Sequence, residues 1–205
     1  MTDRYAIIGN PIAQTKSPAL QTAFARQTGQ DMEYGAILGP LDGFVEAVRE
    51  FQRDGGRGMN ITMPFKLEAF ELADRLSERA RMAGAVNMFT LENDGSIFAD
   101  NTDGFGLVRD ITHNLGRSFK NRRILLLGAG GAVRGVLLPF LAEQPAEIFV
   151  ANRTAAKAVE LAETFVAHAG TTRLAGGGFA DIVGCFDMVI NGSASSMTGE
   201  VPPMP

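Results

Sequence analysis

The glycines of this chain include one compact group, Gly128-Ala129-Gly130-Gly131-Ala132. This group lies directly between the apolar run 124–127, which is typical of a buried strand, and a helical pattern over 132–143. Glycine permits a tight turn and lets the backbone approach a pyrophosphate, which is favoured at the N-terminal end of a helix. The third glycine of the full dinucleotide fingerprint is replaced by Val133. The strand before the turn and the helix after it favour a nucleotide site over a purely structural turn.

Two cations follow the next predicted strand, where a dinucleotide domain selects its cofactor. A domain selective for NAD places Asp or Glu about 20 residues beyond the glycines, to hold the ribose 2′-hydroxyl. Asn152, Arg153 and Thr154 stand there instead, with Lys157 one turn later. A guanidinium can hold a 2′-phosphate through paired hydrogen bonds. Arg153 and Lys157 could also be ordinary surface charges, but their position favours NADP as the cofactor.

Strand and helix patterns alternate along the chain and predict how these groups are placed. Repeated β-then-α units favour an α/β fold with parallel sheet covered by helices. Asn93-Asp94-Gly95 predicts a hairpin, and Ser17 before Pro18 predicts a helix N-cap. The expected strands cover residues 5–9, 32–38, 58–62, 87–92, 96–99, 124–127, 148–151 and 187–190, and the expected helices 18–28, 41–54, 66–76, 103–115, 132–143 and 155–169.

The pattern changes near Asp103, where we place a domain boundary. Residues 1–103 are predicted to form a substrate-binding and catalytic domain, and residues 104–205 a Rossmann-like dinucleotide-binding domain. Two α/β halves predict a ligand-binding cleft between them. The second half shows about four strands where a doubly wound domain generally has six, so the chain looks incomplete at its C-terminus.

Composition excludes several classes of protein. A net charge of −4 without a basic stripe argues against nucleic-acid binding. One cysteine and two histidines offer no metal-ligand spacing and no internal disulfide. No apolar stretch approaches 18 residues, and the N-terminus lacks the charged and apolar regions of a signal peptide. We therefore expect a cytoplasmic protein, a monomer or homodimer, that binds a small molecule and neither metal nor membrane.

Six short motifs, spread over nearly the whole chain, resemble the shikimate dehydrogenase family. Each motif alone is weak, but they occur in the family's order. The motifs are Gly9-Asn10-Pro11 with Thr15-Lys16-Ser17-Pro18, Asn60-Ile61-Thr62-Met63-Pro64-Phe65-Lys66, Ala85-Val86-Asn87, Asp100-Asn101-Thr102-Asp103-Gly104, Gly128 to Ala132, and Asn152-Arg153-Thr154.

The resemblance implies an NADP-dependent oxidoreductase that interconverts 3-dehydroshikimate and shikimate, with Lys66 and Asp103 as the catalytic pair. Hydride transfer to a ketone builds negative charge on oxygen, and a nearby proton donor lowers that barrier. A lysine can serve where its surroundings bring its pKa toward neutrality. Lys66 is therefore expected to donate and accept the proton, and Asp103 to orient it and bind a substrate hydroxyl. Without the resemblance, Lys66 would be a solvated lysine at a helix start and Asp103 an ordinary N-cap.

The family's substrate positions correspond here to Thr15, Ser17, Thr62 and Asn87. Hydroxyl groups suit a carboxylate, and amides can bridge ring hydroxyls. Family members usually carry serine where this chain has Thr15, and glycine where it has Ser196, which would be strained if that position needs a positive φ. They also continue past this chain's last residue, with a tyrosine near the substrate and a glutamine on a later helix.

Two alternatives remain open from the sequence. The enzyme could act on quinate or an amino-substituted analogue, with Thr15 adjusting the acid-binding site. The chain could instead be a paralogue that binds NADP and a metabolite as a sensor with little turnover. The presence of both Lys66 and Asp103 argues against a pure sensor, because a binder does not need the pair.

Overall fold

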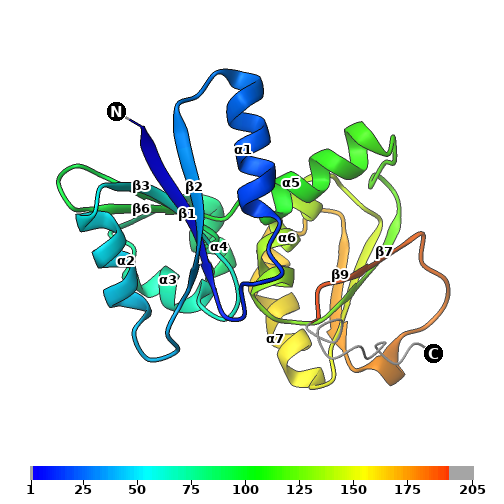
Figure 1. Ribbon diagram of the computed structural model, residues 1–205. Helices are drawn as coiled ribbons and strands as arrows, with labels where there is room; N and C mark the ends of the chain where they lie inside the picture. The colour runs from blue at the N-terminus through cyan, green and yellow to red at the C-terminus, as the bar shows by residue number, and fades with distance from the viewer. Residues whose placement is uncertain (1, 194–205) are drawn as a thin grey trace. The chain divides into compact units, whose positions relative to one another are not determined.

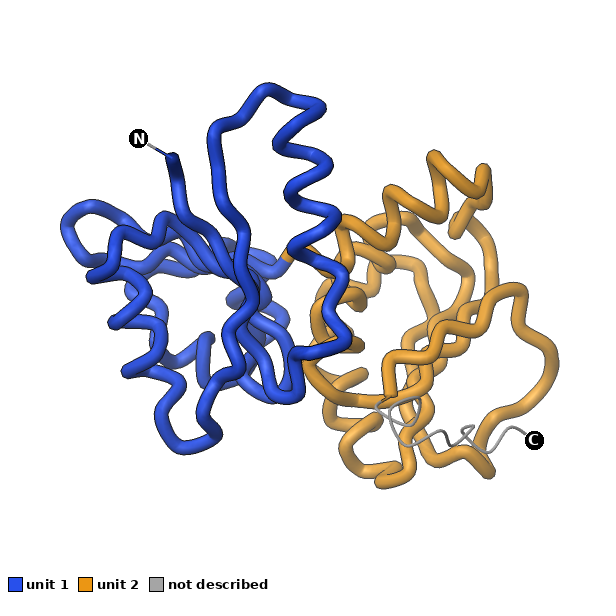
Figure 2. The backbone as a smooth tube through the Cα atoms, in the orientation of Figure 1, with its two compact units in different colours: residues 1–101 blue, residues 102–205 orange. Residues whose placement is uncertain are grey.

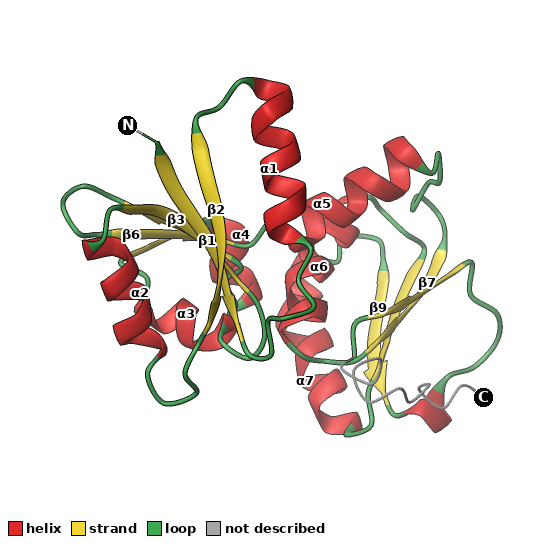
Figure 3. Ribbon diagram, in the orientation of Figure 1, coloured by secondary structure: helices red, strands yellow, loops and turns green. Residues whose placement is uncertain are grey.

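The computed structural model describes residues 2–193, and its chain divides into two compact units (Figure 2). Unit 1 is Met1–Asn101 and unit 2 is Thr102–Pro205. Each unit contains one β-sheet with helices packed on it (Figures 1 and 3). The predicted α/β fold in two parts, with a Rossmann-like second part, is confirmed.

Unit 1 contains a six-stranded sheet in the order β2-β1-β3-β5-β6-β4. Strands β1, β2 and β3 are parallel to one another, but β5 is antiparallel to both β3 and β6. The predicted hairpin joins β5 to β6, and a connection this short forces its strands to run antiparallel. The predicted hairpin is therefore confirmed, and it makes the sheet of this unit mixed. The strands are β1 (Asp3–Gly9), β2 (Met32–Leu38), β3 (Gly56–Ile61), β4 (Arg75–Leu76), β5 (Met88–Leu91) and β6 (Ile97–Asp100), and the helices are α1 (Ser17–Thr28), α2 (Phe44–Arg53), α3 (Lys66–Leu72) and α4 (Glu78–Ala83).

Two helix predictions in unit 1 need correction. Ser17 is the first residue of α1 and not its N-cap, because Lys16 already has helical φ and ψ and takes the cap position. The helix expected over 66–76 ends at Leu72, since Ala73 is extended. After a short strand, Ser77 caps α4 by accepting a hydrogen bond from the Ala80 amide at 3.1 Å.

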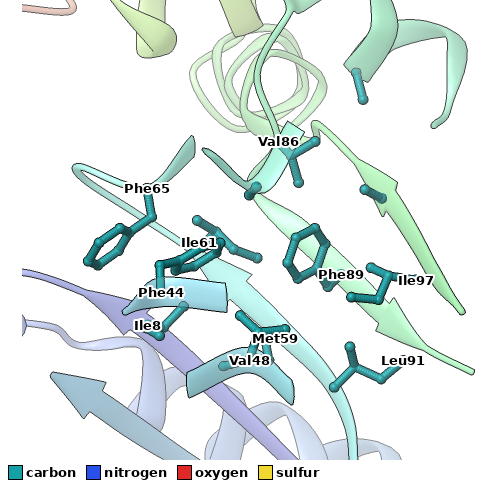
Figure 4. Packing of buried hydrophobic residues seen from close by; sticks show 13 residues of the cluster. Ile8, Phe44, Val48, Met59, Ile61, Phe65, Val86, Phe89, Leu91 and Ile97 are labelled. Atoms are coloured by element: carbon teal, nitrogen blue, oxygen red, sulfur yellow. The ribbon is translucent and has the colours of Figure 1, made fainter. Parts of the chain in front are cut away.

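Aromatic packing fixes α2 and α3 on one face of the unit 1 sheet (Figure 4). Phe44 and Val48, which the sequence spacing places on one helical face, are both fully buried. The Phe44 ring stacks on Phe65 with centroids 4.9 Å apart. Burial of such side chains stabilises the fold by roughly 1.5–3 kcal/mol each. Because Phe65 directly precedes Lys66, this core fixes the start of α3.

Unit 2 contains a four-stranded, fully parallel sheet in the order β10-β7-β8-β9. The chain moves outward from β7 to β8 and β9, then returns to pair β10 on the other side of β7. This reversal is the feature that marks the ligand-binding edge of doubly wound sheets. The strands are β7 (Arg123–Leu127), β8 (Glu147–Ala151), β9 (Arg173–Gly177) and β10 (Met188–Asn191), and the helices are α5 (Asp103–Arg109), which continues as a π-helical segment over Asp110–Asn114, α6 (Gly131–Ala142) and α7 (Ala155–Phe165).

Candidate active site

The substrate-binding candidates lie at one end of the unit 1 strands, the edge where β1 and β3 have their carboxyl ends. Because β1 and β3 are parallel, their carboxyl ends at Gly9 and Ile61 lie at the same edge. Strand β5 is antiparallel to β3, so it begins at this edge, directly after Asn87. The Asn10 amide donates to the Met63 carbonyl at 2.9 Å and ties the loop after β1 to the loop after β3.

Thr15 and Ser17 lie against each other at the start of α1. The Thr15 hydroxyl donates to Ser17 Oγ at 3.2 Å and accepts from the Ser17 amide at 3.3 Å. The two hydroxyl oxygens therefore lie side by side, where both groups could donate to one anionic group. Both residues are half-buried.

Thr62 directly follows β3 and has a tightly held backbone. Its amide donates to the Ile8 carbonyl at 3.0 Å, and its carbonyl accepts from the Phe65 amide at 3.1 Å. Within residues 2–193, no hydrogen bond engages its hydroxyl. Thr62 therefore offers a fixed, half-buried hydroxyl at the sheet edge.

Lys66 and Asn87 are brought together through the backbone. The Lys66 carbonyl accepts from the Val86 amide at 2.9 Å, so the start of α3 adjoins the segment that carries Asn87. Lys66 is half-buried and is the first residue of α3. Asn87 is 8% exposed, and its own backbone bonds to both neighbouring strands, to Ile61 at 2.8 Å and to Asp100 at 3.0 Å.

A polar pair, Tyr34 and Asn60, supports the backbone of Asn87; Asn60 lies in one of the six motifs, but neither residue was predicted to have a role. The Tyr34 hydroxyl donates to Asn60 Oδ1 at 2.5 Å, and Asn60 Nδ2 donates to the Asn87 carbonyl at 3.4 Å. Burial raises the pKa of Tyr34 to about 12, so the phenol stays protonated as a donor. The signal in the sequence is Asn60 itself, a polar residue inside an apolar strand.

A buried carboxylate, Asp100, is the last residue of β6, the strand next to β5. It is 5% exposed and accepts from Arg79 Nε at 2.7 Å, Ser77 Oγ at 2.6 Å and the Asn101 amide at 2.7 Å. The hydrogen bond from Arg79, more than any other contact, holds the pKa of Asp100 below its usual range. The sequence analysis quoted Asp100 in a motif but gave it no role.

In unit 2, the glycine-rich turn lies at the carboxyl end of β7, the central strand. Gly128 has a φ of +108°, which requires glycine, and a Cβ there would lie 3.1 Å from the Gly192 carbonyl oxygen. Gly130 is different, because it is exposed and extended, and no atom of the described chain lies within 4 Å of a Cβ placed on it. The fold therefore does not require glycine at position 130, whereas close approach of a pyrophosphate does. Ala129 lies between Gly128 and Gly130, and Gly131 and Ala132 are the first two residues of α6.

The predicted cofactor-selecting residues follow β8 at the same sheet edge. Asn152 Nδ2 donates to the Thr154 carbonyl at 3.0 Å and shapes the turn before α7. Arg153 and Lys157 are exposed. Within residues 2–193, no hydrogen bond or ion pair engages the Arg153 guanidinium.

Asp103 belongs to unit 2, at the first position of α5. The following residue, Gly104, packs so closely on α6 that a Cβ there would lie 2.5 Å from the Gly135 carbonyl oxygen and 2.7 Å from Pro139 Cγ. Helix α6 starts at the glycine-rich turn, so this contact fixes Asp103 relative to that turn. The predicted boundary at residue 103 lies two residues beyond the division observed between the units.

The described residues show neither a membrane-spanning helix nor a cluster of metal ligands. No helix among residues 2–193 is long and apolar enough to cross a membrane. In the same residues, no group of three or more His, Cys, Asp or Glu side chains could hold a metal ion. Ser196, whose backbone the sequence analysis questioned, lies outside the described residues.

Comparison with known proteins finds the same family in both units. Residues 7–89 match the shikimate dehydrogenase substrate binding domain, and residues 110–198 match the shikimate / quinate 5-dehydrogenase family. A shikimate dehydrogenase (NADP(+)) of Aromatoleum aromaticum is 57% identical over 99% of this chain and 73% of its own.

Solved structures agree with this assignment. The crystal structure of an Ael1 enzyme from Pseudomonas putida has a TM-score of 0.89 and 51% identity, covering all of this chain and 74% of its own. Shikimate 5-dehydrogenase from Thermus thermophilus, in complex with NADP(H) and shikimate, has a TM-score of 0.80 and 29% identity, covering 94% of this chain and 69% of its own. The chain belongs to the shikimate dehydrogenase family.

Proposed function

We propose that the protein is an NADP-dependent oxidoreductase that interconverts 3-dehydroshikimate and shikimate. The observation that carries this proposal is the similarity, across both units, to a shikimate dehydrogenase (NADP(+)) more than half identical to this chain. The arrangement within each unit agrees with it. Unit 1 presents hydroxyl and amide groups at one sheet edge, and unit 2 presents a phosphate-binding turn.

We assign substrate binding to Thr15, Ser17, Thr62 and Asn87. The paired hydroxyls of Thr15 and Ser17 suit the substrate carboxylate, because each hydroxyl can donate to one of its oxygens. The Thr62 hydroxyl and the Asn87 amide suit the ring hydroxyls. The hydrogen bonds behind Asn87 hold it in place before a ligand arrives, which reduces the entropic cost of binding.

We assign cofactor binding to the turn from Gly128 to Ala132 and to Asn152, Arg153, Thr154 and Lys157. The turn fits a pyrophosphate, because the backbone at Gly130 is bare and exposed at the start of α6. The Arg153 guanidinium fits the 2′-phosphate that distinguishes NADP from NAD. Bound NADP supplies the hydride acceptor for the alcohol carbon, or as NADPH the donor for the ketone.

We assign proton transfer to Lys66. In the reducing direction the carbonyl oxygen gains negative charge, and the lysine ammonium gives it a proton. In the reverse direction the neutral amine accepts that proton. Asp103 is assigned as the second member of the catalytic pair, binding a substrate hydroxyl. These roles rest on family motifs and on the positions of both residues at helix starts.

The test is the absorbance of reduced nicotinamide, with shikimate and quinate each offered with NADP and with NAD. Rapid turnover of shikimate with NADP is expected, with much slower turnover of the other three pairs. Arg153→Ala should raise the KM for NADP by about tenfold to a hundredfold and leave that for NAD unchanged, because one charged hydrogen-bonded contact contributes about 1.5–3 kcal/mol. A protein that binds NADP but turns over neither acid would contradict the proposal.

We further propose that the enzyme acts in the cytoplasm, in the biosynthesis of chorismate and aromatic amino acids, as a monomer or homodimer. The exposed free thiol of Cys185 is typical of a reducing compartment. Light scattering of the purified protein distinguishes the two oligomeric states.

A further inference from the structure

Gly9, the last residue of β1, lies directly against the side chain of Thr62. A Cβ placed on Gly9 would overlap the Thr62 methyl carbon Cγ2, and it would lie 3.1 Å from the Met63 carbonyl oxygen. Gly9 is not among the glycines with positive φ. Its backbone conformation therefore does not require glycine, and the requirement comes chiefly from the space that the Thr62 methyl fills, with Ile12 Cδ1 next at 3.2 Å.

This contact decides where the Thr62 hydroxyl points. The Cβ of threonine carries a methyl and a hydroxyl group, and its χ1 angle has only three staggered positions. Hydrogen bonds to Ile8 and from Phe65 fix the Thr62 backbone, so χ1 is its remaining freedom. Once the methyl packs over Gly9, the hydroxyl takes a single direction, and within residues 2–193 no hydrogen bond engages it.

We propose that Gly9 is a positioning residue for substrate binding. The absence of a side chain at Gly9 seats the Thr62 methyl and thereby aims the Thr62 hydroxyl at the substrate. This inference rests on the proposed function, in which Thr62 binds a ring hydroxyl of shikimate. Serine at position 62 would keep the hydroxyl but could rotate it into the space over Gly9.

The experiment moves one methyl group from residue 62 to residue 9. The variants are Gly9→Ala, Thr62→Ser and the double variant, with Gly35→Ala as a matched control. Gly35 lies in neighbouring strand β2 and has no atom of the described chain within 4 Å of a Cβ. For each variant we would measure kcat, the KM for shikimate, the KM for NADP and the melting temperature.

Gly9→Ala should raise the KM for shikimate at least tenfold, because the two methyl groups collide and Thr62 rotates. Thr62→Ser should raise it about threefold, because the hydroxyl is no longer held. In the double variant the methyl at position 9 fills the vacated space and blocks the wrong serine rotamer. The KM of the double variant for shikimate should therefore be no higher than that of Thr62→Ser. The KM for NADP should stay unchanged in every variant. Gly35→Ala should have the kinetic constants and melting temperature of the wild type.

The inference fails if Gly9→Ala leaves the KM for shikimate unchanged, or if the double variant is as defective as the product of the two single changes. If Gly9→Ala does not fold, a folded and active double variant still supports the inference, and an unfolded one overturns it. A wild-type protein without shikimate turnover would refute the proposed function instead, so the two failures are distinguishable.

Discussion

In unit 1 the candidate residues present side chains from backbone segments that are held by hydrogen bonds, whereas in unit 2 the candidate turn is built from residues with almost no side chain. Asn87 is supported by Asn60 and Tyr34. A Cβ placed on Gly130, by contrast, would meet nothing of the described chain beyond its immediate neighbours. A ring with several hydroxyl groups is recognised by directional donors and acceptors at fixed angles, whereas a pyrophosphate is recognised by backbone amides that it must reach. The two ligands therefore demand opposite local chemistry.

The same difference appears in burial. Asp100 and Asn101 in unit 1 are 5% and 1% exposed, and such buried polar groups are costly unless they are hydrogen-bonded. Both have partners, since Asn101 Nδ2 donates to the Ala85 carbonyl at 3.0 Å. Arg153 in unit 2 is exposed and costs little to keep in water. Unit 1 has its binding groups fixed before a ligand binds, while unit 2 keeps a solvated cation for the ligand to engage.

The largest effect is expected from Lys66→Ala, which removes the proposed proton donor from unit 1 and leaves unit 2 unchanged. The value of kcat should fall by about a hundredfold or more, the scale of general acid–base catalysis, while the KM for shikimate stays within about threefold. The helix should persist, because alanine favours helices and the Lys66 carbonyl that binds Val86 is retained. Steady-state kinetics would check this against Lys120→Ala, an exposed lysine of unit 2. An unchanged rate would contradict the assignment.

The next effect concerns the buried support of unit 1. Asp100→Asn should lower the free energy of unfolding by about 2–3 kcal/mol, because an amide NH₂ would then face the Arg79 donors. The control is Asp42→Asn, an exposed carboxylate of the same unit, which should change little. Urea denaturation monitored by circular dichroism gives both values.

The pH dependence of that effect has a definite sign. Since the folded pKa of Asp100 is lowered, its carboxylate stabilises the protein above the unfolded pKa of about 4, and this contribution is lost as the pH falls through the lower folded value. Wild type should therefore lose more stability than Asp100→Asn below about pH 4. Parallel curves for the two proteins would exclude Asp100 as a source of acid sensitivity.

A smaller effect should distinguish two kinds of glycine in unit 2: those that leave space for the ligand and those that leave space for a neighbouring helix. Gly130→Ala should raise the KM for NADP about tenfold, on the scale of one lost contact, with the melting temperature unchanged, because only the cofactor would meet the new methyl. Gly104→Ala should instead destabilise the unit by about 1–3 kcal/mol, because its methyl would press on Gly135 and Pro139. Gly106→Ala, with open space around it in α5, is the control and should stabilise the unit by roughly 1 kcal/mol, because alanine is the better helix former. If Gly130→Ala also melted earlier, the comparison between the units would not hold.

Periodicity in the sequence predicts most of the fold and fails where local signals are weak. Strand β2 is predicted at its observed limits, Met32–Leu38. Strand β9 is missed because Gly176 and Gly177 have little intrinsic preference for strands. The hairpin signal at Asn93-Asp94-Gly95 predicts that β5 and β6 run antiparallel, but no local signal specifies that β5 pairs antiparallel to β3.

In the candidate site, the sequence predicts the residues proposed to contact ligands but not the residues that support them. Motifs identify the residues proposed to meet ligands, such as Thr62 and Arg153, because their neighbours in the chain form the pattern. The supporting residues are missed because their partners are distant in sequence. Tyr34 is 26 residues from Asn60, and Arg79 is 21 residues from Asp100. Only the folded sheet shows these pairings.

Val133 occupies the place where the dinucleotide fingerprint has its third glycine, which ordinarily lets helix and strand approach each other. The facing residue after β10 is Gly192, and a Cβ there would lie 2.5 Å from Val133 Cγ2. The absence of a side chain at Gly192, in the facing loop, thus leaves the space that the Val133 side chain fills. The two positions should therefore evolve as a coupled pair: a chain that regains glycine at position 133 can accept a side chain at position 192, whereas one that keeps valine cannot.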